Sequence, residues 1–141
     1  MITLNGGCRC ENLSVQLVLS RAPETYAPRS CDCDFCREHG AAYVSDPEGS
    51  LRLRIRSERA CERYRQGDGM AECLICTECG VYVAALYAEA GGFLYGAVNV
   101  RVLDGTPGFA PWQSVSPKRL SAEDKIKRWK ELWFSDVTVE G

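Results

Sequence analysis

The chain has 141 residues, of which 45% are hydrophobic and 26% are charged, and its formal net charge is −2 at pH 7. This balance is ordinary for a soluble globular protein and excludes an intrinsically disordered chain. No window of about 18 apolar residues occurs, so we expect no membrane span, and the slightly acidic charge gives no general attraction to nucleic acid. A chain of this length fits a single domain, which we place over residues 1–141.

The N-terminus and the cysteine content together indicate a reducing compartment. Met1 to Asn5 contain no charged leader followed by a long apolar segment, so we expect a cytoplasmic protein. Thiols stay reduced there, and nine cysteines, an odd number, fit complete disulfide pairing badly. We therefore expect these cysteines to bind metal, to take part in chemistry or to lie in the core.

Short segments with a period of two predict β-strands along most of the chain. The clearest is LSVQLVL at residues 13–19. Further strands are predicted at residues 41–45, 51–55, 60–65, 70–75, 81–87 and 93–102. Turn-forming clusters follow at residues 46–49, 66–69 and 90–92. These hairpins predict a mainly β fold of antiparallel sheets.

The C-terminal part predicts one α-helix. Ser121 and Asp124 have the spacing of an N-terminal cap. Ile126, Trp129 and Trp133 recur on one helical face, so we expect the tryptophans to pack on a sheet.

The sequence indicates less about the structure of the segment before this helix and about the role of the basic runs. Residues 104–119 contain three prolines and predict a long loop across the domain, which the sequence does not place relative to a site. The basic runs Arg52/Arg54/Arg56 and Lys125/Lys127/Arg128 are interpreted as solvated faces.

Seven cysteines fall into three tight groups with the spacing of metal ligands. The stretch CTECG, with Cys76 and Cys79, is typical of a zinc knuckle, in which the glycine relieves the tight turn. A knuckle supplies half of a tetrahedron, and the pair Cys8 and Cys10 is a good candidate for the other half. We interpret these four cysteines as a closed, structural zinc site.

The stretch CDCDFC leaves Cys31, Cys33 and Cys36 without an obvious fourth cysteine. Three protein ligands and an open position are typical of catalytic zinc, whereas a filled tetrahedron is typical of structural zinc. The interpretation is therefore two zinc ions per chain, with these three cysteines at the catalytic one.

Other assignments stay open at this point. The second tetrahedron could be closed by Cys73, Asp34 or His39, or the CxC and CxCxxC groups could share one ion. Cys61 and Cys73 are interpreted as buried thiols. Candidates for proton transfer are Asp32, Asp34 and His39, against the simpler interpretation as solvent-facing loop residues.

In this order and spacing, the three groups resemble the glutathione-dependent formaldehyde-activating enzyme family, which also contains centromere protein V. The resemblance is carried by GGCRC at 6–10, CDCDFCR at 31–37, CTECG at 76–80, and Tyr95-Gly96 leading to Leu103-Asp104. It covers about residues 4–104 and leaves the loop and helix at 105–141 outside. It implies a fold of the β-tent type stapled by zinc, with the same division into structural and catalytic ligands.

The resemblance also implies an activity. The family adds a thiol such as glutathione to formaldehyde, so this chain is expected to be a zinc-dependent carbon–sulfur lyase resembling S-(hydroxymethyl)glutathione synthase. Its partners would be a small thiol and a small aldehyde, without nucleic acid or membrane. The alternatives are a non-enzymatic zinc-binding interaction module and a thiol or zinc redox sensor. The number of assembled chains is left open, with a homodimer among the options.

Three positions depart from the family pattern. Glu11 stands where a glycine usually follows the second cysteine, Asp32 stands where histidine is common, and Gly96-Ala97-Val98-Asn99 replaces a segment that often ends in leucine and aspartate. The zinc ligands are unaffected. We expect these positions to lie near the ligand, so the substrate does not follow from the resemblance.

Overall fold

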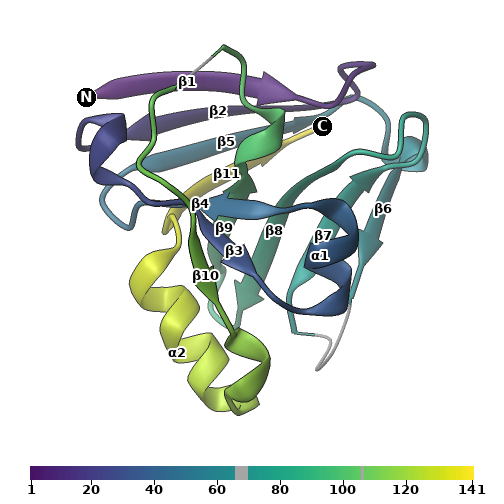
Figure 1. The fold of residues 1–141 in the computed structure, drawn as a ribbon. Helices are drawn as coiled ribbons and strands as arrows, with labels where there is room; N and C mark the ends of the chain where they lie inside the picture. Colours follow the sequence, from purple (N-terminus) through teal and green to yellow (C-terminus); the bar gives the residue numbers. More distant parts are fainter. Residues whose placement is uncertain (66–69, 106) are drawn as a thin grey trace.

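A computed structural model describes residues 1–65, 70–105 and 107–141 of the protein. The predicted turn at 66–69 lies outside the described residues. Within them the fold is mainly β, as predicted, with one four-stranded and one seven-stranded sheet. Figure 1 shows the smaller sheet across the top of the larger one, with the C-terminal helix below.

The four-stranded sheet has the order β1-β2-β5-β11. Its strands are β1 (Ile2–Gly7), β2 (Leu13–Leu19), β5 (Ser50–Ile55) and β11 (Asp136–Glu140). The alternation predicted in β2 and β5 is confirmed, because Leu13, Leu17 and Leu53 are fully buried while Arg52 and Arg54 are exposed. β11, which the sequence did not predict, pairs with β5 in parallel.

The seven-stranded sheet has the order β10-β3-β4-β9-β8-β7-β6. Its strands are β3 (Arg29–Cys31), β4 (Ala42–Val44), β6 (Cys61–Tyr64), β7 (Glu72–Cys76), β8 (Tyr82–Glu89), β9 (Phe93–Asn99) and β10 (Gln113–Val115). All its pairs are antiparallel except β10 with β3. The strand predicted at 93–102 ends at Asn99, and residues 100–102 form a 3₁₀ turn.

The described residues form two α-helices, of which one was predicted. Helix α2 (Ala122–Leu132) begins as expected at Ser121, whose Oγ accepts a hydrogen bond from the Asp124 N–H at 3.1 Å. The short helix α1 (Asp34–His39) contradicts the interpretation of this segment as a loop. Neither helix of the described chain is long and apolar enough to cross a membrane.

Strand β8 lies in the middle of the layers and is buried on both faces. Ala84 and Leu86 belong to the core shared with the four-stranded sheet. Ala85 and Tyr87 pack against Trp133 at the end of α2, so the predicted packing of the helix on a sheet is confirmed. Because the helix covers this second face, residues from β8 and α2 can share one cavity.

A buried carboxylate organises the turn after β4. Asp46 is only 2% exposed. Its Oδ2 accepts hydrogen bonds from the Ser20 N–H at 2.8 Å and from the hydroxyls of Ser20 and Tyr26, each at 2.6 Å. Its Oδ1 accepts one from the Glu48 N–H at 2.9 Å. Burial alone would raise the pKa of Asp46, but these bonds outweigh it and lower the pKa to about 2.

We expect Asp46→Asn to lower the free energy of unfolding at pH 7 by about 2 kcal/mol. Because the pKa is lower in the folded state than in the unfolded chain, the stabilisation is complete above about pH 4 and is lost as the pH falls through about 2. Urea unfolding between pH 7 and pH 2 measures this dependence. The exposed Asp136→Asn is the control, and a wild-type slope retained in Asp46→Asn would contradict the assignment.

Candidate functional site

Four cysteine sulfurs from distant parts of the chain converge on one point. Cys8 and Cys10 follow β1, while Cys76 ends β7 and Cys79 lies in the next turn. The four sulfurs lie within 4.8 Å of one another, with Cys8 to Cys10 at 3.7 Å and Cys10 to Cys76 at 3.5 Å. Tetrahedral zinc at about 2.3 Å from each sulfur would separate them by about 3.8 Å. The set therefore fits a metal ion and is too wide for disulfides, in which the sulfurs are about 2.05 Å apart.

The turn that carries this group is built as the sequence indicates. Gly80 has a left-handed φ of 73°, and its N–H donates to the Cys76 carbonyl at 2.7 Å. Burial raises the pKa of Cys76 to about 12. Burial also acts on Cys79, but hydrogen bonds from the Cys10 N–H and the Cys76 thiol outweigh it and lower the pKa to about 6. The first group therefore favours the deprotonated form of at least one of its thiols.

The second group lies at the junction of β3 and α1. Cys31 ends β3, Cys33 caps α1, and Cys36 lies in its first turn. The Cys33 Sγ accepts a hydrogen bond from the Cys36 N–H at 3.4 Å, because a cap and the third helical residue face each other. The three sulfurs lie within 4.8 Å of one another. The helix start therefore explains why this CxxC spacing brings its thiols together.

The thiols of the second group are electrostatically unequal. A hydrogen bond between Cys31 and Cys36 lowers the pKa of Cys31 to about 6 and raises the pKa of Cys36, which is also buried. The Cys36 Sγ is 3.0 Å from the Tyr43 hydroxyl, which is 2.7 Å from the Tyr82 hydroxyl. Burial raises the pKa of both tyrosines well above the usual range. Tyr43 therefore keeps a proton that it can donate to the sulfur.

A cavity of about 190 Å³ lies beside the second group, and no described cysteine of the first group lines it. Its wall has sulfur, aromatic and cationic parts. These are Cys31, Cys33, Cys36 and Cys73; Tyr43, Tyr82, Trp129 and Trp133; and Arg29, Lys118, Lys125 and Arg128. The described part of the wall contains no acidic side chain.

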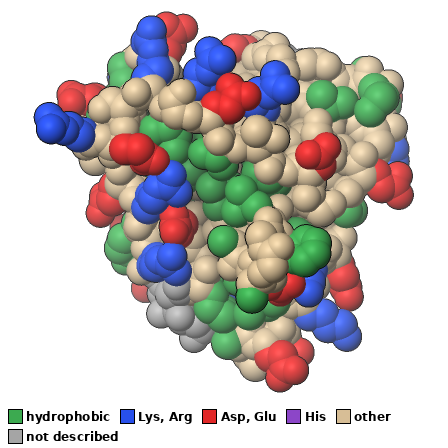
Figure 2. Space-filling model, turned by 180° about the vertical axis from the view of Figure 1, so that it is seen from behind, with side chains coloured by type: hydrophobic (Ala, Val, Ile, Leu, Met, Phe, Trp, Pro, Cys, Tyr) green, Lys and Arg blue, Asp and Glu red, His purple; other side chains and the backbone are tan. Residues whose placement is uncertain are grey.

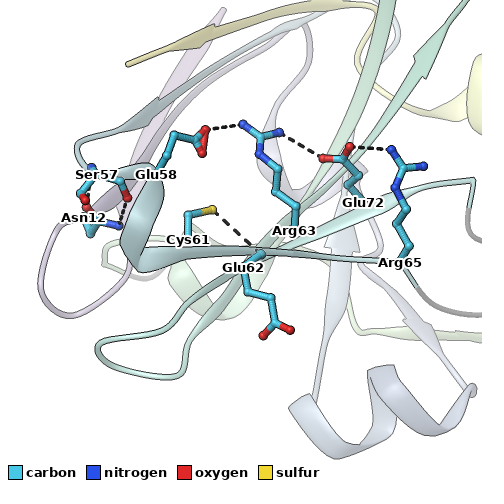
Figure 3. A network of polar contacts seen from close by, with 8 residues as sticks. All are labelled: Asn12, Ser57, Glu58, Cys61, Glu62, Arg63, Arg65 and Glu72. Atoms are coloured by element: carbon cyan, nitrogen blue, oxygen red, sulfur yellow. Dashed lines mark hydrogen bonds and ion pairs between the residues drawn. The ribbon is translucent and has the colours of Figure 1, made fainter.

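The structure places the two remaining cysteines outside both groups. Cys73 is 5% exposed, which confirms the prediction of burial, and it lines the cavity. Cys61 is half-buried on β6. Figure 3 shows it beside the ion pairs of Arg63 with Glu58 at 2.6 Å and with Glu72 at 3.1 Å. Neither thiol belongs to either of the two sulfur groups that could hold a metal ion among the described residues.

The candidates for proton transfer also lie outside the described cavity wall. Asp34 is exposed at the start of α1. His39, predicted in a loop, instead lies in the last turn of α1, with its ring 4.5 Å from Phe35 and 5.6 Å from Tyr82. Asp32 lies 3.9 Å from the Lys118 ammonium. Neither Asp34 nor His39 joins the three sulfurs.

Several cavity residues were missed or misread in the sequence. Lys125 and Arg128 were interpreted as part of a solvated face, which is wrong because both line the cavity. Their spacing with Trp129, i, i+3 and i+4, is a signal that could have placed them together. The predicted loop at 104–119 contains β10 and lines the cavity through Val115, Pro117 and Lys118.

Asn99 was expected near a ligand, but its side chain instead forms hydrogen bonds with the backbone of neighbouring segments. It is 3% exposed, and its Nδ2 donates to the Tyr82 carbonyl at 3.0 Å. Its Oδ1 accepts from the Arg101 N–H at 3.3 Å, which caps the 3₁₀ turn. Asn99 is not among the described residues of the cavity wall, so it supports the sheet rather than the ligand site.

Comparison with known proteins relates the chain to one family. A family model described as glutathione-dependent formaldehyde-activating enzyme matches residues 3–117. A crystal structure of a Rhodobacter sphaeroides protein, a structural genomics target, is 28% identical, with a TM-score of 0.55 over 77% of this chain and 99% of that one. No curated protein matches the chain. The family match ends before α2, which supplies part of the cavity wall.

One departure from the family pattern has a clear backbone consequence. Glu11 has a φ of 63°, the left-handed region that disfavours side chains, and its N–H donates to the Cys8 carbonyl at 3.1 Å. We expect Glu11→Gly to raise the free energy of unfolding by about 0.5–1 kcal/mol, as measured by chemical denaturation. Glu11→Ala keeps the Cβ and should bring no such gain. An equal gain in both variants would assign the effect to the side chain instead.

Proposed function

The chain belongs to the glutathione-dependent formaldehyde-activating enzyme family, and on this premise we propose that it joins a thiol to formaldehyde or another small aldehyde. The observation that carries the proposal is the difference between the two sulfur groups. Four sulfurs form a complete set away from the described cavity wall, whereas Cys31, Cys33 and Cys36 form an incomplete set that lines it. A substrate can therefore approach the second group.

The proposed reaction needs no oxidant or reductant. The sulfur of the thiol forms a bond to the aldehyde carbon, the S–H bond breaks, and the carbonyl oxygen takes up a proton to become a hydroxyl. Run backwards, the same reaction cleaves a carbon–sulfur bond, which makes the activity that of a carbon–sulfur lyase. The enzyme then has to gather a thiolate and a carbonyl in one place.

Both sulfur groups fit zinc, the ion for which thiolate sets of this spacing are typical. We assign a structural ion to Cys8, Cys10, Cys76 and Cys79, and a catalytic ion to Cys31, Cys33 and Cys36. Zinc bound by the three thiolates would supply stabilisation of the incoming thiol in its thiolate form.

The surrounding side chains hold the second group in position. With Cys36 as a thiolate, the Tyr43 hydroxyl, which is also hydrogen-bonded to Tyr82, would donate to the Cys36 sulfur and orient it toward the cavity. Trp129 and Trp133 cover another side of the cavity with stacked rings whose centroids are 5.0 Å apart. These rings give the cavity an apolar side against which the body of a thiol could pack.

The alternative of a nucleic-acid interaction module has less support. On the face shown in Figure 2, Lys and Arg side chains are interspersed with Asp and Glu around a central group of hydrophobic side chains. Binding to a phosphate backbone depends on clustered basic side chains instead. We therefore favour small-molecule partners.

We expect the purified protein to contain two zinc ions per chain, as measured by plasma emission. Cys36→Ser should lower the count by one and change stability little, because its group spans a single local turn. Cys79→Ser should cost about 5 kcal/mol or more or cause aggregation, because its group ties β7 to the segment after β1. Thermal unfolding measures the difference.

The control for these variants is Cys61→Ser, which alters a half-buried thiol outside both groups and should retain two zinc ions. Equal losses of stability in Cys36→Ser and Cys79→Ser would contradict the division into structural and catalytic ions. A loss of zinc from Cys73→Ser would instead make Cys73 a fourth ligand of the second group.

We expect the zinc-loaded protein to accelerate the formation of S-(hydroxymethyl)thiols at least about tenfold over the spontaneous reaction, followed by exchange NMR. Tyr43→Phe should lower this rate, and the affinity for zinc in a chelator competition, about tenfold or more. Tyr95→Phe removes a hydroxyl that does not line the described cavity and serves as the control. No acceleration with any thiol, together with zinc release by equimolar peroxide, would favour the redox sensor.

A further inference from the structure

Two guanidinium groups line the cavity without a carboxylate partner in the described part of the chain. Arg29 lies on β3, two residues before Cys31, and its Nη2 donates to the Ser45 Oγ at 2.6 Å. Arg128 lies on α2 and is half-buried. The ion pairs found among the described residues include neither arginine.

The positive charges of Arg29 and Arg128 are only partly balanced in this arrangement. Burial removes water from both side chains, and the charge of Arg128 acts against that of Arg29. The nearby sulfurs offset only part of this charge, since three thiolates on a divalent ion carry about −1 in total. Lys118 also lines the wall, but it lies 3.9 Å from the Asp32 carboxylate, so it leaves the charge of the two arginines as the one to be balanced. An anion in the cavity would compensate both arginines at once.

The rest of the wall limits what that anion can be. Trp129 and Trp133 stack at 5.0 Å, and Ala85 and Val115 are also apolar. The described wall has no acidic side chain to receive an ammonium group. Its volume of about 190 Å³ is below the roughly 300–1,000 Å³ of sites for drug-sized ligands. These features suit a small apolar body that carries a carboxylate.

We propose that Arg29 and Arg128 form a carboxylate-binding subsite and that the preferred thiol is a small mercaptocarboxylate with an apolar body. The identity of the thiol rests on the proposed function, whereas the carboxylate subsite does not. Glutathione would meet the arginines through one of its carboxylates, but its ammonium group would have no acidic partner in the described wall. We therefore expect it to be a weaker ligand than a simple mercaptocarboxylate.

The first test measures binding without any reaction. Trp129 and Trp133 line the cavity, so 3-phenylpropionate, which has no thiol, should change the tryptophan fluorescence. The neutral 3-phenylpropanamide has the same shape and should bind about tenfold more weakly or worse. Equal affinities for the acid and the amide would overturn the proposal, and so would an absence of saturable binding of the acid.

The second test compares two substitutions on the same helix. Arg128→Gln should weaken 3-phenylpropionate binding about tenfold or more, because it removes a charged donor. Lys127→Gln removes the same charge from an exposed neighbour outside the described wall and should leave binding within about twofold. Equal weakening in both variants would reduce the effect to general electrostatics and overturn the subsite. The comparison of acid with amide decides the matter if Arg128→Gln does not fold.

The third test separates the subsite from the reaction. With formaldehyde and zinc-loaded protein, 2-mercapto-3-phenylpropionate should react with a kcat/KM about tenfold higher than glutathione, and Arg128→Gln should remove the preference. Acceleration of all thiols alike would overturn the assignment of the thiol and leave the proposed function standing. Carboxylate binding that depends on Arg128, without acceleration of any thiol, would support the subsite and contradict the proposed function.

Discussion

The convergence of Cys8, Cys10, Cys76 and Cys79 is the constraint on which the rest of the fold depends. The first two thiols follow β1 in the four-stranded sheet, and the other two lie at the end of β7 in the seven-stranded sheet. Their grouping closes a loop of more than sixty residues, and closing such a loop costs conformational entropy that bonds at the junction must offset. An ion held there would join the two sheets, which is why we assign it a structural role.

Strand β7 connects the first sulfur group to the second. Cys76, at the end of the strand, belongs to the first group, while Cys73, three residues earlier, packs with Cys31 and Cys36. Tyr82 begins the neighbouring strand β8 and is hydrogen-bonded to Tyr43, which contacts Cys36. The two groups therefore share a pair of strands. One group lies at the junction of the sheets, and the other faces the cavity under α2.

Local patterns made part of this arrangement predictable. The alternation in β2 and β5, the cap at Ser121 and the glycine of the knuckle each depend on a few neighbouring residues, and all three are found in the structure. β3 and β10 have three residues each, too few to show a period. β11 pairs in parallel with β5, a partner more than eighty residues away in sequence, and such pairing leaves no local turn signal.

The cavity was less predictable than the sulfur groups because its wall is assembled from residues 29–133. The spacing of cysteines within one turn is visible in the local sequence. The approach of Arg128 to Arg29 instead depends on how α2 packs on β8 and β9, which the local sequence does not show.

The type of reaction and the choice of substrate therefore depend on different parts of the chain. The sulfur groups lie inside the segment that matches the family, residues 3–117, while Lys125, Arg128, Trp129 and Trp133 lie beyond it. The matched segment thus holds the atoms proposed to carry the reaction, and the helix that follows supplies part of the wall that a substrate would touch. Substitutions in α2 can change the charge and shape of the cavity without moving a sulfur. Membership of the family therefore constrains the type of reaction more strongly than the thiol on which this chain acts.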